Sequence, residues 1–183
     1  KYTEGRFNPT GLATFAAPLD GVPHPTCGPI PVSDIIDPNL RTGLLITEED
    51  LSPGWLLDEI TPVATATLQA TQHRSPLAAS SLATEFVSNA LADSASRFKY
   101  RLGGVNQVTP ASLTDWAKSH GIAQIVTSYV PSGPTRDALH DASLVQVMRP
   151  FDAAAWPQAT HGFFRFRENI PRLLGRIKGL SAI

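Results

Sequence analysis

Beyond residue 42 the chain alternates between short continuous apolar runs and longer stretches in which apolar residues recur every three or four positions. The short runs, bounded by turn residues, are typical of buried strands, and the longer spacing is typical of amphipathic helices. The runs predict five strands, at residues 43–47, 63–68, 98–102, 124–129 and 144–148. The spacing predicts four helices, at residues 53–59, 82–97, 109–120 and 135–142.

Capping signals support two of these helices. Ser52-Pro53 and Thr109-Pro110 each place a capping side chain before a proline that suits the first helical turn. Gly121 follows the second of these helices, as expected at a helix C-terminus.

The helix over residues 82–97 is the clearest one and has an apolar face. Leu82, Phe86, Ala90 and Leu91 share that face at near-helical spacing. We therefore expect this face to be covered by the rest of the fold.

The alternation of strands and helices predicts how the strands run. Two strands that flank a single helix run parallel, because a hairpin cannot hold a helix between them. The predicted fold class is therefore α/β: one Rossmann-like domain over residues 43–183, with about five parallel strands and helices on both faces, by the count above.

Residues 1–42 have a different composition. They hold seven of the sixteen prolines, a density that disfavours both helix and central strand. We expect an extended, Pro-rich linker or wrapping arm there. Because the chain begins at Lys1, we expect it to be a piece of a longer protein.

Composition narrows the classes of function. A net charge of -1 argues against a free-standing nucleic-acid binder, which normally has a basic face. Cys27 is the single cysteine, so internal disulfides and cysteine-cluster metal sites are excluded, in keeping with a cytoplasmic protein. The five histidines lack metal-ligand spacing, and no apolar run approaches the roughly 20 residues of a membrane span.

Four short segments follow one another in a characteristic order: an acidic stretch after the first strand, a glycine pair before a proline-capped helix, an Arg-Asp pair at a helix start, and an aromatic exit segment. They are residues 47–51, Gly103-Gly104, Arg136-Asp137 and residues 160–164. Their order resembles the antenna-type α/β domain of the photolyase and cryptochrome family. Residues 1–7, Lys-Tyr-Thr-Glu-Gly-Arg-Phe, look like the tail of that family's FAD domain.

The resemblance implies a rearranged bacterial FAD-binding deoxyribodipyrimidine photolyase-like protein with this domain placed C-terminally. The parent would be a lyase in blue-light-dependent repair of pyrimidine dimers in DNA, or a light-signalling cryptochrome. FAD would lie in a missing helical domain of the same chain, which is the expected partner, and DNA would be reached only through the parent. This part alone is expected to hold no FAD and to perform no catalysis.

One departure from the family pattern affects the antenna chromophore. Where the family has two arginines after the first strand, this chain has Glu48 and Glu49, followed by Asp50. Three acidic groups repel an anionic pterin tail or a phosphate. Whether a chromophore binds, and which one, stays open, as does the oligomeric state.

In an open parallel sheet, ligands lie outside the carboxyl ends of the strands. This rule gives Thr47, Glu48, Ser128 and Tyr129 as candidate residues of an antenna or nucleotide pocket. Tyr129 could stack on a flat ring and Ser128 could hydrogen-bond it; the alternative is that Tyr129 only covers the end of the sheet. Residues 132–136 read as an ordinary capped turn rather than a phosphate loop.

The C-terminal region is aromatic and basic. Phe163, Phe166, Ile170 and Leu173 have the spacing of one helical face, which predicts an amphipathic helix that docks on the partner domain. The alternative is nucleic-acid binding through Arg165 and Arg167, with the phenylalanine rings stacking on bases.

Two other functions remain open. One is a stand-alone nucleotide-binding domain of the universal-stress or electron-transfer-flavoprotein type, against which the acidic strand end argues. The other is a nucleic-acid-binding accessory domain, against which the near-zero net charge argues.

Overall fold

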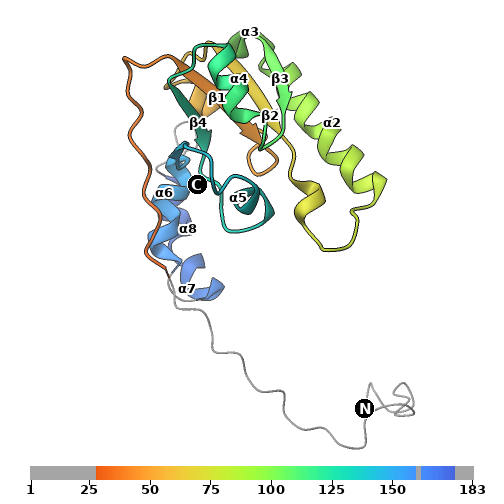
Figure 1. Cartoon of the computed structure of the whole chain (residues 1–183). Coiled ribbons are helices and arrows are strands. Elements are labelled where there is room, and N and C mark those ends of the chain that lie inside the picture. The colour runs from red at the N-terminus through yellow and green to blue at the C-terminus, as the bar shows by residue number, and fades with distance from the viewer. Residues whose placement is uncertain (1–27, 160–161, 176–183) are drawn as a thin grey trace, which may run out of the picture.

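The computed structural model describes residues 28–159 and 162–175, and its centre is a single parallel sheet (Figure 1). The strands are β1 (Thr42–Thr47), β2 (Ala64–Leu68), β3 (Val105–Val108), β4 (Gln124–Ser128) and β5 (Val145–Val147). They lie in the order β3-β2-β1-β4-β5, and every neighbouring pair is parallel. The predicted α/β, Rossmann-like fold with five parallel strands is confirmed.

Helices connect the strands and continue beyond the last one. They are α1 (Gly54–Leu57), the 3-10 turn η1 (Thr71–His73), α2 (Ser81–Arg97), α3 (Lys99–Leu102), α4 (Leu113–Ser119), α5 (Pro134–Ala138), α6 (Pro150–Ala155), the 3-10 turn η2 (Trp156–Gln158), α7 (Phe163–Arg167) and α8 (Ile170–Leu174).

Both faces of the sheet are covered, because successive side chains of a strand point to opposite sides. Leu44 and Ile46 of β1 pack against buried leucines of α1, α2 and α3. Leu45, between them, packs on the other face against Leu113 and Trp116 of α4. The central strands are therefore buried on both sides, which explains why β1 reads as a continuous apolar run.

Gly43 of β1 has a packing role. A Cβ atom at this position would lie 2.6 Å from Cδ1 of Ile122 and 2.9 Å from the Trp116 ring. The small residue lets α4 and the segment after it approach the sheet closely.

The third strand was predicted at the wrong place. Residues 98–102 alternate in polarity, but Phe98 and Leu102 are also one helical turn apart and both belong to the core beside α2. That segment is α3, which ends at Gly103 with a φ of +64°. The third strand is β3, which begins directly after Gly104. The resemblance implies a third strand that ends at the glycine pair, so this part of the family pattern does not align with the structure.

Two helix starts also differ from prediction. The N-cap residue of α1 is Pro53, and Ser52 instead donates its backbone N–H to Asp50. Thr109 and Ser112 hydrogen-bond each other in a turn, so α4 begins only at Leu113.

Only part of the apolar face predicted for α2 is buried. Leu91 is buried, with 4% of its surface exposed, but Leu82 and Phe86 are 77% and 72% exposed. The α2 residues that pack with the core of the sheet are Val87, Leu91 and Ala95, so the later part of the helix is the part that faces inward.

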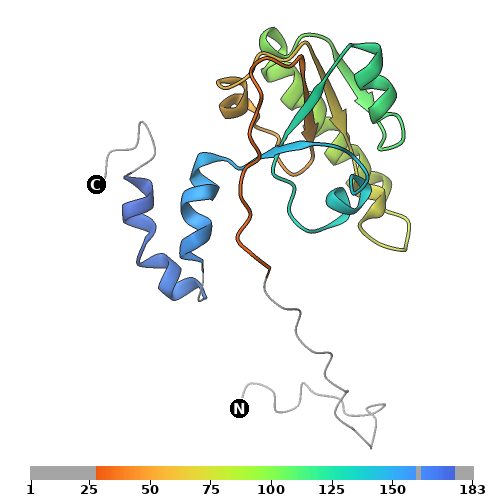
Figure 2. The ribbon, with the colours of Figure 1, turned by 60° about the vertical axis from the view of Figure 1, so that its left-hand side comes forward.

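Residues 28–37 of the predicted arm have no helix or strand, and the chain passes beside β5 at Ser33 and Asp34 before a turn at residues 38–40 (Figure 2). The Asp34 backbone N–H donates to the Gln146 carbonyl at 2.8 Å, and the Gln146 N–H donates back to the Asp34 carboxylate at 2.8 Å. The Met148 N–H donates to the Ser33 hydroxyl at 2.9 Å. This part of the arm therefore belongs to the edge of the sheet, while residues 1–27 lie outside the described residues.

Candidate functional site

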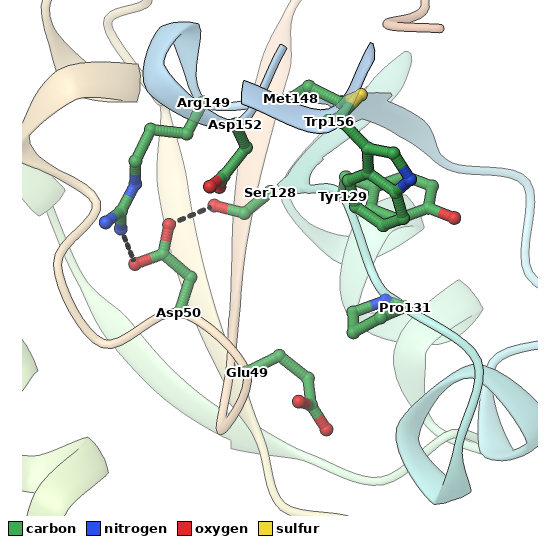
Figure 3. A pocket seen from close by; sticks show the side chains of 9 residues that line it. All are labelled: Glu49, Asp50, Ser128, Tyr129, Pro131, Met148, Arg149, Asp152 and Trp156. Atoms are coloured by element: carbon green, nitrogen blue, oxygen red, sulfur yellow. Dashed lines mark hydrogen bonds and ion pairs between the residues drawn. The ribbon is translucent and has the colours of Figure 1, made fainter. Parts of the chain in front are cut away.

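The sheet order reverses between β1 and β4, because the chain adds strands first on one side of β1 and then on the other. Such a switch point leaves a crevice at the carboxyl ends of the two strands. A cavity of about 250 Å³ lies at this place (Figure 3). Its lining residues are Glu49, Asp50, Ser128, Tyr129, Pro131, Met148, Arg149, Asp152 and Trp156.

Asp50 is the central side chain of the cavity wall. Its Oδ1 accepts from the Ser52 backbone N–H at 2.9 Å and from Arg149 Nη2 at 2.5 Å. Its Oδ2 accepts from the Ser128 hydroxyl at 2.8 Å and from the Trp55 indole N–H at 3.0 Å. One carboxylate thus ties together the ends of β1 and β4, helix α1, and the start of α6.

These contacts also set the charge of Asp50. Burial raises the pKa of this carboxyl, but the hydrogen bonds from Ser52, Trp55, Ser128 and Arg149 outweigh burial and leave the pKa below its ordinary value of 3.8. Asp50 is therefore an anion at neutral pH and does not act as an acid there.

The lowered pKa predicts an acid-dependent loss of stability. Because the pKa is lower in the folded chain than in the unfolded one, Asp50 stabilises the fold fully above its unfolded pKa of about 3.9. That contribution is lost as the pH falls through the folded-state pKa. Urea unfolding of the wild type and Asp50→Asn should show a constant difference in unfolding free energy between about pH 5 and 7 that shrinks below pH 4. A difference that grows in acid would contradict the argument.

Two further carboxylates face the cavity. Glu49 follows β1, and its Oε1 accepts from the hydroxyl of Thr135, a buried residue of α5, at 2.8 Å. Asp152 comes from α6 on the opposite side of the cavity (Figure 3). With Asp50 paired to Arg149, Glu49 and Asp152 give the cavity a negative potential.

Aromatic rings close another side. Tyr129 and Trp156 meet edge to face, with ring centroids 5.7 Å apart at an interplanar angle of 88°. The Arg136 guanidinium lies 5.7 Å from the centroid of the Tyr129 ring and donates from Nη1 to the tyrosine hydroxyl at 3.1 Å.

The structure brings only half of the four predicted pocket residues to this cavity. Ser128 and Tyr129 line it. Thr47 is buried and accepts weakly from the Glu49 backbone N–H, at 3.4 Å. Glu48 is directed elsewhere: its carboxylate accepts from the Ala70 N–H and from the Thr71 and Arg74 side chains, and so holds η1 against the end of β1.

Sequence reasoning missed Arg149, Asp152 and Trp156, and it noted Glu49 and Asp50 only as repulsive charges. The rule of carboxyl ends contains the missing signal, since Arg149 follows β5 as closely as Asp50 follows β1. Asp152 and Trp156 lie one and two helical turns further on, and no local pattern marks them.

The predicted turn at residues 132–136 does not form a phosphate site. Its helix, α5, has five residues. The Thr135 hydroxyl donates to the Glu49 carboxylate, and the Arg136 guanidinium donates to the Tyr129 hydroxyl. The turn therefore supports the acidic and aromatic walls of the cavity.

The predicted docking helix is two short helices, α7 and α8, with Pro171 in the first turn of α8. Leu173 is buried and Phe166 and Ile170 are half-buried, and α8 contacts α6. Of the four predicted docking residues, only Phe163 is largely exposed, at 63%, and it is joined by Phe164, which was not predicted, at 76%. Arg165 and Arg167 are exposed beside them.

The comparisons with known proteins found no relative. No family model, no curated protein and no solved structure matches this chain. Within residues 28–159 and 162–175, no three His, Cys, Asp or Glu side chains group as metal ligands. In the same part of the chain, every helix is too short or too polar to cross a membrane.

Proposed function

We propose that this chain is the antenna-type α/β domain of a photolyase- or cryptochrome-like flavoprotein of the cytoplasm. It packs on a FAD-binding helical domain of the same parent chain. The parent uses blue light for the repair of pyrimidine dimers or for signalling, and this domain contributes structure and a small pocket rather than catalysis.

One observation carries the proposal: two of the segments that resemble the family lie in the connections after the paired strands β1 and β4. Residues 47–51 comprise the last residue of β1 and the loop after it, and Arg136-Asp137 lies in α5, the helix that follows β4. The cavity lies between these two connections, where an open α/β sheet places its ligands.

The exposed aromatic side chains after β5 support a covering partner. The rings of Phe163 and Phe164 in α7 have centroids 5.8 Å apart, and the helical segment after β5 lies away from the sheet (Figure 2). Trp156 and Leu174, in the same C-terminal region of the chain, are about two-fifths exposed. Neighbouring exposed apolar groups of this kind are typical of interaction surfaces.

A stand-alone nucleotide-binding domain has less support. Phosphate sites use backbone N–H groups at a helix N-terminus together with cationic side chains. The cavity instead presents the carboxylates of Glu49 and Asp152, and the guanidinium of Arg149 is held by Asp50.

Nucleic-acid binding is the second candidate, because Arg165 and Arg167 are exposed beside two exposed phenylalanine rings. A surface of this kind binds single strands through phosphate pairing and base stacking. It would give binding whose affinity falls with salt, with a slope that decreases when the arginines are neutralised.

Absorbance spectroscopy tests the proposal. The protein expressed from its complete reading frame should show the near-ultraviolet and blue bands of a bound flavin, and residues 1–183 alone should lack them. The proposal is contradicted by a complete protein without flavin. It is also contradicted if the isolated domain binds ATP or AMP, or if it binds single-stranded DNA in the salt-dependent manner described above.

A further inference from the structure

We propose that the cavity between β1, β4 and α6 binds a small planar cation, such as an amidinium, a guanidinium or a protonated amino-heterocycle. This inference names the class of ligand for the pocket of the proposed function. The inference depends on the proposed function only in assuming that another domain covers the pocket.

The size of the cavity restricts the ligand. A volume of about 250 Å³ is roughly that of eight water molecules at about 30 Å³ each. It suits one substituted ring and is too small to enclose a dinucleotide. A single ring in a cavity of this size can contact the acidic wall and the aromatic wall at once.

The charged residues that line the cavity favour a cationic ligand. Three carboxylates and one guanidinium line the cavity, and the guanidinium, Arg149, is already paired with Asp50. The two remaining carboxylates belong to Glu49, which follows β1, and to Asp152 of α6 (Figure 3). A planar cation with N–H groups on its edge matches a carboxylate through two parallel hydrogen bonds, whereas a phosphate or carboxylate ligand meets repulsion.

The aromatic wall favours the same class. The faces of tyrosine and tryptophan rings attract cations, and a planar cation can also stack on them. Because the Arg136 guanidinium already lies over the Tyr129 ring, the ring on which a ligand would stack is that of Trp156. Trp156 belongs to the wall of the cavity and is partly exposed.

Three probes of nearly equal shape test the inference on residues 1–183: benzamidinium, benzamide and benzoate, which carry charges of +1, 0 and -1. Titration followed by NMR should show saturable shifts of the Ser128 and Tyr129 amides and the Trp156 indole with benzamidinium. Benzamide should bind at least about tenfold more weakly, because charge-assisted hydrogen bonds are about twice as strong as neutral ones. Benzoate should not bind at these residues.

Variants identify the groups responsible. Glu49→Gln keeps an acceptor for Thr135, and Asp152→Asn changes an exposed side chain, so both should fold normally. Each should weaken benzamidinium binding about tenfold. Asp115→Asn, an equal change of charge at an exposed position of α4, should leave the affinity unchanged.

Several results would overturn the inference: binding of benzoate as tight as that of benzamidinium, absence of saturable shifts, shifts at another surface, or an equal loss of affinity in Asp115→Asn. The titration is then repeated with the complete protein. Retention of the site there indicates a free small molecule, whereas loss of the site shows only that another domain covers it, and the inference then stands or falls on the titration of residues 1–183. Because the flavin spectrum is a separate measurement, the proposed function can fail while this inference holds, and the reverse.

Discussion

Replacing Asp50 by alanine should lower the free energy of unfolding by about 2–4 kcal/mol at neutral pH. The carboxylate accepts four hydrogen bonds, and its side chain is only 11% exposed. Alanine leaves the Ser128 hydroxyl, the Trp55 indole N–H and the Arg149 guanidinium without their acceptor. Arg149 is 38% exposed and can turn to water, which keeps the loss below that of a fully buried pair.

Urea denaturation measures this loss, and Asp115→Ala is the matched control. Asp115 is an exposed aspartate on the surface of α4, and its removal should change the free energy of unfolding by less than about 0.5 kcal/mol. Equal effects of the two variants would show that the contacts of Asp50 contribute nothing beyond the charge.

Replacing Leu91 by alanine should lower the free energy of unfolding by about 2–4 kcal/mol. Leu91 is the buried apolar side chain of α2, and it packs in the core beside Leu44, Ile46 and Val126. The loss combines the transfer free energy of the removed methyl groups with the cost of the cavity left behind.

The matched variant is Phe86→Ala, five residues earlier on the same helix. Phe86 is 72% exposed, and alanine is the better helix former, so the change should stay within about 0.5 kcal/mol. Thermal or urea unfolding of both variants gives the comparison. A loss at Phe86 as large as at Leu91 would show that the N-terminal half of α2 is buried in the protein.

The strands of the centre could be predicted from the sequence because their signal is local. The run over residues 43–47 is buried on both faces, so its apolar residues follow one another without interruption. The strand β3 carried no such signal, because Val105, Asn106 and Gln107 lie exposed at the edge of the sheet.

The direction in which α2 faces could not be predicted, for a different reason. Its apolar positions are spaced correctly, but which of them meet the sheet depends on where the helix begins relative to the strands. Leu82 and Phe86 stay exposed because only the later part of α2 packs on the sheet, and nothing in the helix sequence marks where that part begins.

The sequence predicted the location of the candidate site but only some of the residues that line it. The rule for strand ends gave Ser128 and Tyr129 correctly. It could not tell that Glu48 would turn to η1 while Asp50 turned to Arg149, because both choices depend on donors that are distant in the sequence.

The hydrogen bonds of Ser33 and Asp34 have a consequence for how this protein behaves in concentrated solution. An open sheet normally ends in strands whose outward backbone groups are able to recruit a foreign strand, a common beginning of aggregation. At β5 the outward N–H groups of Gln146 and Met148 are already taken by a carboxylate and a hydroxyl. Those side chains satisfy the outer amides without adding a regular strand, so at these two positions the sheet offers a neighbouring molecule no free donor to pair with.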